Sequence, residues 1–249
     1  MRTGLTLGID VTITKLVSYN PLHEERVKTW PANNPSYVDL GALRVAAVFK
    51  RHRSPRDEQD GNPLIYSLKK LRGYTIAPSC VTLIAGCACS ILPNCFKGQK
   101  FDFIVPMPSS ARIPARLAQC AASAFGHPAQ VLNLFRKATA AEALAAMPAI
   151  ATVAPRDKED FKRTQERLAS VKPGSAFSMK DVPARIRCHM IPICLSATSG
   201  SLAGKSILLV DDLLSSGQTL KVGSDILNRL GATATKALVF LGPIGNRPA

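Results

Sequence analysis

Residues 207–220 read Ile-Leu-Leu-Val-Asp-Asp-Leu-Leu-Ser-Ser-Gly-Gln-Thr-Leu. The four residues at 207–210 are all apolar, which is typical of a strand that is covered on both faces in the middle of a sheet. Asp211 and Asp212 follow at the carboxyl end of this strand, the edge at which open α/β sheets bind their ligands. The stretch therefore predicts a ligand site built around two carboxylates.

The residues after the strand predict an anion site beside these carboxylates. They offer hydroxyl groups, an amide and a glycine that lets the backbone approach a ligand: Ser215, Ser216, Gly217, Gln218 and Thr219. We expect a helix over residues 217–230, so its unpaired N–H groups and its dipole point at this loop. A Cβ at Gly217 would clash with a bound phosphate or force a dihedral angle that only glycine adopts cheaply.

A sugar phosphate needs both halves of this site. The carboxylates suit ribose hydroxyls, and the loop suits a phosphate. Asp211 and Asp212 could also hold Mg²⁺, directly or through water, because Mg²⁺ commonly takes one or two carboxylates together with substrate oxygens.

Other interpretations of the same residues are weaker. An Asp pair after a strand can simply cap a helix, and Ser-Ser-Gly is a common turn. A receiver domain also has paired acids after a strand, but it would need about a hundred further residues, and only 37 follow Asp212. The GxxxxGK[ST] pattern of P-loop proteins is absent from the sequence.

Strand and helix patterns alternate over the last two-thirds of the chain. We expect helices over residues 64–72, 81–92 and 115–125, strands over 101–106, 206–210 and 235–241, and an exposed helix or a mobile loop over 156–168. This alternation predicts an α/β fold with a parallel sheet flanked by helices.

The first 61 residues are expected to form an N-terminal extension of unknown role, followed by the main domain over residues 62–249. Residues 5–17 alternate apolar and polar side chains, which predicts one strand. Residues 43–49 fit a second strand or a short helix. Asp10 lies on the first of these strands, and a lone acid there is more often a turn or surface residue than a catalytic one.

Charge and cysteine content limit the choice of partners and compartment. The net charge of +15 is spread along the chain, which suits either a polyanionic small substrate or a nucleic acid backbone. The seven cysteines lack Cys-x-x-Cys spacing, so we expect neither a zinc site nor a disulfide framework, and the four histidines show no ligand spacing. No signal peptide is apparent and residues 80–96 read as a buried helix rather than a membrane span, so a cytoplasmic protein without membrane contact is expected.

The motifs together resemble a known family. Residues 207–220 look like the signature of type I phosphoribosyltransferases, and the wider arrangement is similar to the ComF family of competence-associated phosphoribosyltransferases. The stretches that carry this wider likeness are residues 64–73, 101–108, 136–139, 176–177 and 202–205. Residues 1–60 differ from the cysteine-paired zinc module that is usual in that family.

The resemblance implies a type I phosphoribosyltransferase fold that binds phosphoribosyl pyrophosphate and Mg²⁺ and transfers phosphoribose with release of pyrophosphate. It adds candidates on three other segments to the residues of the signature. These are Ser109, Ser110 and Arg112 on a loop that contacts pyrophosphate, Lys69 on an early helix, and Arg136 and Lys137 at the start of a mobile loop. Arg112, Asp211 and Asp212 are the candidates for catalysis.

A second class of function stays open at this point. A non-catalytic relative could keep the pocket as a ligand sensor and bind nucleic acid through its basic surface, in DNA uptake, regulation or defence. A homo-oligomer or a protein complex is compatible with either function.

Overall fold

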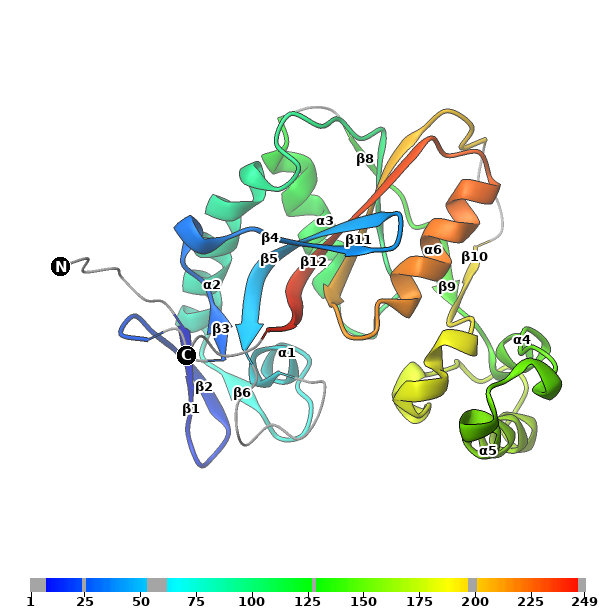
Figure 1. The fold of residues 1–249 in the computed structure, drawn as a ribbon. Coiled ribbons are helices and arrows are strands. Elements are labelled where there is room, and N and C mark those ends of the chain that lie inside the picture. Colours follow the sequence, from blue (N-terminus) through cyan, green and yellow to red (C-terminus); the bar gives the residue numbers. More distant parts are fainter. Residues whose placement is uncertain (1–7, 24–25, 53–61, 127–128, 197–200, 246–249) are drawn as a thin grey trace.

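The computed structural model describes residues 8–23, 26–52, 62–126, 129–196 and 201–245. Its main sheet has seven strands, in the order β3-β5-β12-β11-β7-β8, with β4 also paired to β5 (Figure 1). These strands are β3 Val27–Lys28, β4 Ser36–Leu40, β5 Leu43–His52, β7 Phe103–Pro106, β8 Gln130–Val131, β11 Ser206–Leu213 and β12 Ala234–Gly245. Strands β5, β12, β11, β7 and β8 run parallel, and β3 and β4 run antiparallel to β5. The mainly parallel α/β sheet predicted from the sequence is confirmed.

Six α-helices accompany the strands in the described part of the chain. They are α1 Pro63–Leu68, α2 Pro78–Ile91, α3 Ile113–Ala124, α4 Ala140–Ala145, α5 Lys158–Ser170 and α6 Gln218–Arg229. Short 3₁₀ helices are η1 Pro31–Asn33, η2 Leu92–Asn94, η3 Ile150–Thr152, η4 Pro155–Asp157, η5 Met179–Asp181 and η6 Ala184–His189. Small sheets are made by β1 Gly8–Val11, β2 Leu16–Asn20 and β6 Thr75–Ile76, and by β9 Phe135–Lys137 with β10 Ile193–Leu195. Among the described residues, no helix is long and apolar enough to cross a membrane.

Helices cover both faces of the main sheet, and β11 shows why its sequence is apolar throughout. Leu208 and Val210 pack in one cluster with α2 and α3, whereas Ile207 and Leu209 pack in another with α6. All four side chains are fully buried. Successive residues of a strand point to opposite faces, so a strand covered on both faces must be apolar at every position.

The N-terminal residues do not form the single strand that their alternation predicts. The structure has β1 and β2 as an antiparallel pair, with a turn between them. The amide of Leu16 donates to the Thr12 hydroxyl oxygen at 3.1 Å, and Lys15 takes a left-handed φ of 62°. Ile13, which the alternation places on the apolar face of the predicted strand, lies at this turn and is fully exposed. The alternation continued through the turn by chance, because Thr12 and Thr14 happen to follow the polar pattern. Leu5 and Leu7 lie outside the described residues.

Residues 43–52 form a strand of the main sheet rather than a helix. Strand β5 pairs in parallel with β12, with Ala46 opposite Leu238, and residues 45–49 are almost completely buried. Part of the proposed extension therefore completes the sheet that carries the site. The domain boundary at residues 61 and 62 stays a prediction.

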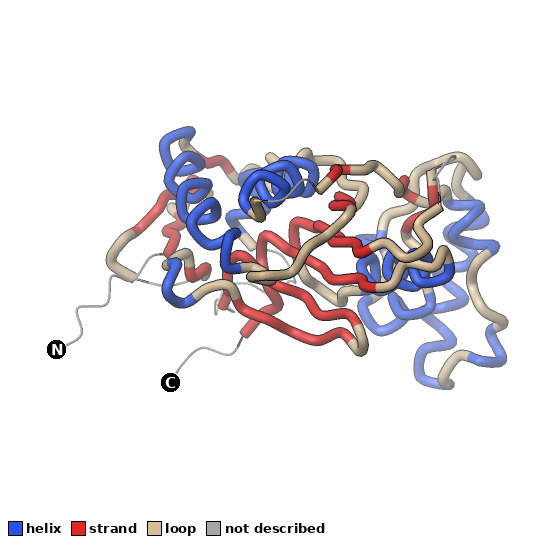
Figure 2. Tube along the Cα trace, turned by 90° about the horizontal axis from the view of Figure 1, so that it is seen from above, coloured by secondary structure: helices blue, strands red, loops and turns tan. Residues whose placement is uncertain are grey.

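Residues 138–190, which we call the insertion, form a helical lobe at one end of the sheet (Figures 1 and 2). The lobe contains α4 and α5, and its own apolar cluster includes Ala143, Leu168, Phe177, Ile186 and Met190. For residues 156–168 the sequence predicts either an exposed helix or a mobile loop, and the structure has helix α5 there. The last part of the insertion turns back toward the main sheet and leads into β10.

Candidate functional site

The carboxyl end of β11 and the start of α6 place the signature residues together. Strand β11 extends to Leu213, so Asp211 and Asp212 are the sixth and seventh of its residues. Residues 215–219, which we call the phosphate loop, then lead into α6, whose first residue is Gln218. Helix α6 thus begins one residue after the predicted Gly217, close to the carboxyl end of β11.

Gly217 is the N-cap of α6 and has a left-handed φ of 72°. A side chain is strained in this conformation. A Cβ at this position would also overlap with Cδ1 of Leu40, at the tip of the β4–β5 hairpin. The dihedral argument for this glycine is therefore supported, and the contact with Leu40 adds a second constraint from a segment far away in the sequence.

The two aspartates have different surroundings. Burial of its carboxylate, together with the adjacent charge of Asp212, raises the pKa of Asp211 to about 7. The amide of Asp212 donates to Oδ1 of Asp211 at 2.8 Å. The Asp212 carboxylate is almost completely buried, pairs with Lys69 at 2.5 Å and accepts a 3.2 Å hydrogen bond from the hydroxyl of Ser109. Lys69 and Ser109, expected near the signature from the resemblance, are thus brought to Asp212.

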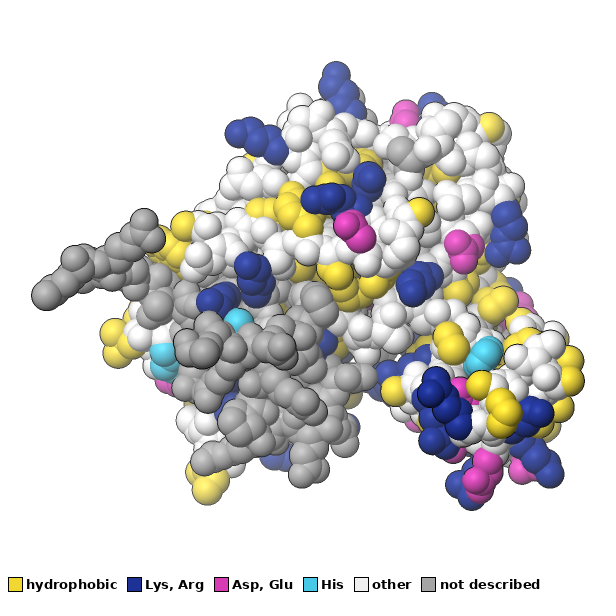
Figure 3. Space-filling model, viewed as in Figure 1, with side chains coloured by type: hydrophobic (Ala, Val, Ile, Leu, Met, Phe, Trp, Pro, Cys, Tyr) yellow, Lys and Arg dark blue, Asp and Glu magenta, His cyan; other side chains and the backbone are white. Residues whose placement is uncertain are grey.

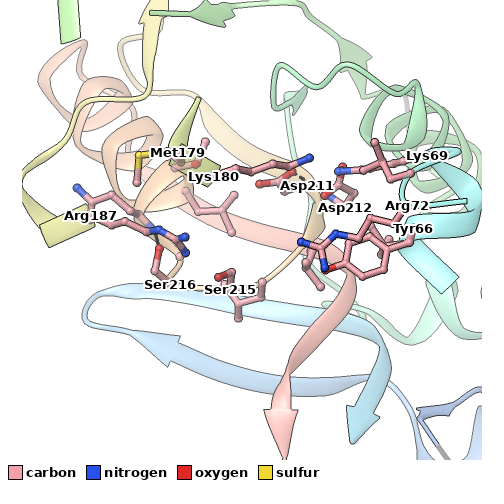
Figure 4. A pocket seen from close by; sticks show the side chains of 18 residues that line it. Tyr66, Lys69, Arg72, Met179, Lys180, Arg187, Asp211, Asp212, Ser215 and Ser216 are labelled. Atoms are coloured by element: carbon pink, nitrogen blue, oxygen red, sulfur yellow. Dashed lines mark hydrogen bonds and ion pairs between the residues drawn. The ribbon is translucent and has the colours of Figure 1, made fainter. Parts of the chain in front are cut away.

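A cavity of about 810 Å³ opens above these residues. Its wall is formed by the aspartate pair, the phosphate loop, residues around α1, and η5 and η6 of the insertion. The charged and aromatic side chains that line it are Tyr66, Lys69, Arg72, Lys180, Arg187, Asp211 and Asp212 (Figure 4). Lys69 and Lys180 reach toward the aspartates, while Arg72 and Arg187 extend from opposite sides toward Ser215 and Ser216. The cavity therefore combines acceptors for hydroxyl groups with four cations for phosphates.

Three of these cations, Arg72, Lys180 and Arg187, were not assigned from the sequence. Helix α1 ends at Leu68, so the basic residues predicted on it lie in the turn that follows. In that turn Arg72 has a φ of 55° and its guanidinium stacks on the Tyr66 ring at 4.9 Å. Partial burial and the nearby Lys69 lower the pKa of Lys180. Lys180 and Arg187 are not part of any recognisable sequence motif, so their place at the cavity is apparent only in the folded chain.

Other predicted residues lie away from the cavity wall in the described structure. Arg112 is exposed as the N-cap of α3, and Ser110 is exposed beside it on the loop after β7. Arg136 makes two hydrogen bonds to Glu142, at 2.8 and 2.6 Å. Lys137, next to it, is close enough to Lys180 to contribute to the lowering of its pKa. None of these four lines the cavity.

A buried arginine of β5 binds the backbone of the residue that precedes the phosphate loop. Arg51 is 3% exposed. It donates to the carbonyl oxygen of Leu214 at 2.9 Å and to that of Gly242 at 2.6 Å. The amide of Leu214 also donates to the carbonyl oxygen of Leu241 at 2.9 Å. The backbone N–H and the carbonyl oxygen of Leu214, the residue before the phosphate loop, are thus both hydrogen-bonded.

The aspartate pair fits a divalent cation that arrives with a diphosphate. Two carboxylates meet at the cavity wall. The pKa of Asp211 is raised because burial and the adjacent charge of Asp212 outweigh the opposing effect of Lys69, so a further cation would be favoured there. Mg²⁺ takes one or two carboxylates and completes its octahedron with substrate oxygens and water. Within the described ranges, no group of three or more His, Cys, Asp or Glu side chains could hold a metal, so the ion would depend on substrate oxygens and water to complete its shell.

Comparison with known proteins agrees with this geometry. The sequence profile described as "phosphoribosyl transferase domain" matches residues 74–248. A search of curated proteins found no match. The matched segment contains β7, β11, α6 and β12, with the aspartate pair and the phosphate loop. The chain belongs to the phosphoribosyl transferase domain family.

Proposed function

We propose that the chain binds phosphoribosyl pyrophosphate with Mg²⁺ in this cavity and transfers its phosphoribose to an acceptor, with release of pyrophosphate. The observation that carries the proposal is the meeting of Asp211 and Asp212 with the phosphate loop in one cavity lined by four cations. We also propose that, within the phosphoribosyltransferases, the chain is most similar in arrangement to the ComF family.

In this proposal the signature residues hold the phosphoribosyl group. The N–H groups and hydroxyls of the phosphate loop bind the 5′-phosphate, because a helix N-terminus and a glycine-containing turn favour an anion. Asp211 and Asp212 accept hydrogen bonds from the ribose hydroxyls. Lys69 neutralises Asp212 until the ligand and its cation arrive.

Lys69 and Lys180, which reach toward the aspartates, face the leaving group. As the bond between C1 of the ribose and the pyrophosphate oxygen breaks, the acceptor's lone pair forms the new bond to C1, and pyrophosphate leaves with both electrons of the broken bond. Bound Mg²⁺ would supply charge neutralisation for the departing pyrophosphate. Cations fixed in place before the reaction stabilise that charge without reorganisation.

The loop after β7 and strand β9, which precedes the insertion, keep their proposed roles. Ser109, Ser110 and Arg112 are candidates for the pyrophosphate side, with Ser109 already bonded to Asp212. Arg136 and Lys137 could approach the cavity with the insertion if the insertion closes over the ligand.

Calorimetry with phosphoribosyl pyrophosphate and Mg²⁺ tests the binding. The wild type is compared with an Asp211→Asn, Asp212→Asn double variant and with an Asp225→Asn, Glu166→Gln control, which removes two exposed acids outside the cavity wall. We expect affinity to fall at least about tenfold in the first variant and to stay unchanged in the second. Equal affinity in all three proteins would remove the aspartates from the site.

Pyrophosphate release in the presence of purine and pyrimidine bases tests the transfer. Binding without release would instead favour the non-catalytic alternative, in which case a salt-dependent gel shift with DNA or RNA is the next measurement. The face in Figure 3 shows Lys and Arg scattered among acidic side chains rather than gathered in one stripe. We place the small-molecule function first because the aspartate pair, the phosphate loop and four cations line one cavity.

A further inference from the structure

The side chain of Gln218 in the phosphate loop is engaged with the insertion. Its amide Nε2 lies 3.2 Å from the carbonyl oxygens of both Cys188 and Met190 and donates to them. A glutamine amide has two N–H donors, so both carbonyls can be satisfied at once. The first residue of α6 therefore fastens the end of the insertion to the phosphate loop.

The fastened segment carries Arg187. Its Nε donates to the carbonyl oxygen of Val182 at 3.0 Å, and the neighbouring Ile186 and Met190 are buried in the apolar cluster of the insertion. Arg187 therefore lies between residues that are buried in the apolar cluster and a backbone segment that Gln218 binds through hydrogen bonds. In Figure 4 its guanidinium points into the cavity above Ser216.

We propose that Arg187 is a ligand of the 5′-phosphate and that Gln218 is the residue that positions it. The inference rests on the proposed function, because the phosphate is that of the phosphoribosyl group. The planar guanidinium matches a phosphate better than a lysine does. The phosphate would then lie between the N–H groups of the phosphate loop and an arginine from the insertion. The next residue after that arginine, Cys188, is bonded to Gln218 although 30 residues separate the two in the sequence.

Two fragments of the ligand separate the subsites. Ribose 5-phosphate carries only the 5′-phosphate, and inorganic pyrophosphate with Mg²⁺ carries only the leaving group. We expect Arg187→Met to weaken binding of ribose 5-phosphate about tenfold or more in calorimetry, and to leave that of pyrophosphate unchanged. Arg187→Lys should recover part of the loss. Lys172→Met removes an exposed cation of the insertion outside the cavity wall and should change neither.

A double-variant cycle tests the positioning role. Gln218→Met keeps the length of the side chain but removes the amide. It should weaken binding of ribose 5-phosphate in the wild type and have little further effect in the Arg187→Met background, because Gln218 acts through Arg187. If the two losses add in full, Gln218 binds the ligand directly and the positioning role is wrong.

Two results separate this inference from the proposed function. If the wild type binds neither phosphoribosyl pyrophosphate nor ribose 5-phosphate, the proposed function fails. If it binds both and Arg187→Met binds them equally well, only the role of Arg187 is overturned. Hydrogen exchange of residues 182–190 gives a readout without ligand: exchange should be faster in Gln218→Met, and unchanged exchange would contradict the attachment.

Discussion

Nη2 of Arg51 donates a 2.9 Å hydrogen bond to the carbonyl oxygen of Leu214, so a strand outside the matched family segment holds the residue that precedes the phosphate loop. We expect Arg51→Met to leave two buried carbonyl oxygens without this donor, at a cost of about 1–3 kcal/mol for each. Urea denaturation of the variant and the wild type measures the loss.

Arg51→Lys separates the charge from the geometry. A single ammonium cannot reach both Leu214 and Gly242 as the fork of a guanidinium does. We expect intermediate stability and a weaker affinity for phosphoribosyl pyrophosphate in the folded protein. A lysine variant with wild-type affinity would show that the loop keeps its position without the arginine.

Gly217→Ala should destabilise the protein for two separable reasons. The left-handed φ of 72° costs about 1–2 kcal/mol for a residue with a Cβ, and the methyl group overlaps with Leu40. We expect Leu40→Ala to recover the second part and not the first when both changes are combined. Thermal denaturation of the two single variants and the double variant measures these parts, and full recovery in the double variant would mean that φ contributes nothing.

Lys69→Met should destabilise the protein by leaving the nearly buried Asp212 carboxylate without its partner. The removal of one member of a buried ion pair typically costs about 3–5 kcal/mol. The side chains of Lys69 and Asp212 are 13% and 8% exposed, so the lower end of that range is expected. The Asp212→Asn, Lys69→Met double variant should be more stable than Lys69→Met alone.

The same variant tests competition between Lys69 and a cation. With the lysine removed, Mg²⁺ should raise the melting temperature of Lys69→Met more than that of the wild type, because Asp212 is then available to the ion. Ca²⁺ at the same concentration controls for a general ionic effect. Equal shifts in both proteins would mean that Asp212 does not meet the cation.

The salt bridge between Arg136 and Glu142 predicts an acid-dependent term in stability. The hydrogen bonds from Arg136 and from the amide of Thr139 lower the pKa of Glu142 from 4.5 to about 2. A carboxylate with a lowered pKa stabilises the fold above its unfolded pKa, and this contribution is lost as the pH falls through the folded value. The difference in unfolding midpoint between wild type and Glu142→Gln should therefore shrink between pH 4.5 and 2. A difference that stays constant over this range would contradict the shift.

The signature could be located from sequence because its local pattern and its place in the fold agree. The apolar run at 207–210 is buried on both faces, and α6 begins within a residue of its predicted start. This segment was predictable because it is continuous in sequence: one strand, one turn and one helix are enough to locate it.

The rest of the site depends on contacts between distant segments. Nothing near Arg51 in the sequence indicates that it would meet Leu214, 163 residues away. Arg187 lies in a 3₁₀ segment without periodicity, so its place at the cavity depends on the packing of the insertion. The prediction of a single N-terminal strand failed for the opposite reason. The local alternation of side chains was present, but a turn that contains the left-handed Lys15 divides the segment into two strands.

The pairing of β5 with β12 also has a consequence during synthesis. Arg51 and Gly242 are 191 residues apart, so the buried stretch at 45–49 leaves the ribosome long before its parallel neighbour exists. At about 5–20 residues per second, that wait is on the order of 10–40 seconds. Throughout this interval one edge of an apolar strand has no permanent partner and is open to wrong pairing with other nascent chains. The antiparallel strand β4, made just before β5 and joined to it by a tight turn at Gly41, can cover the other edge at once. A chaperone that binds early apolar strands would be expected to increase the yield of this protein.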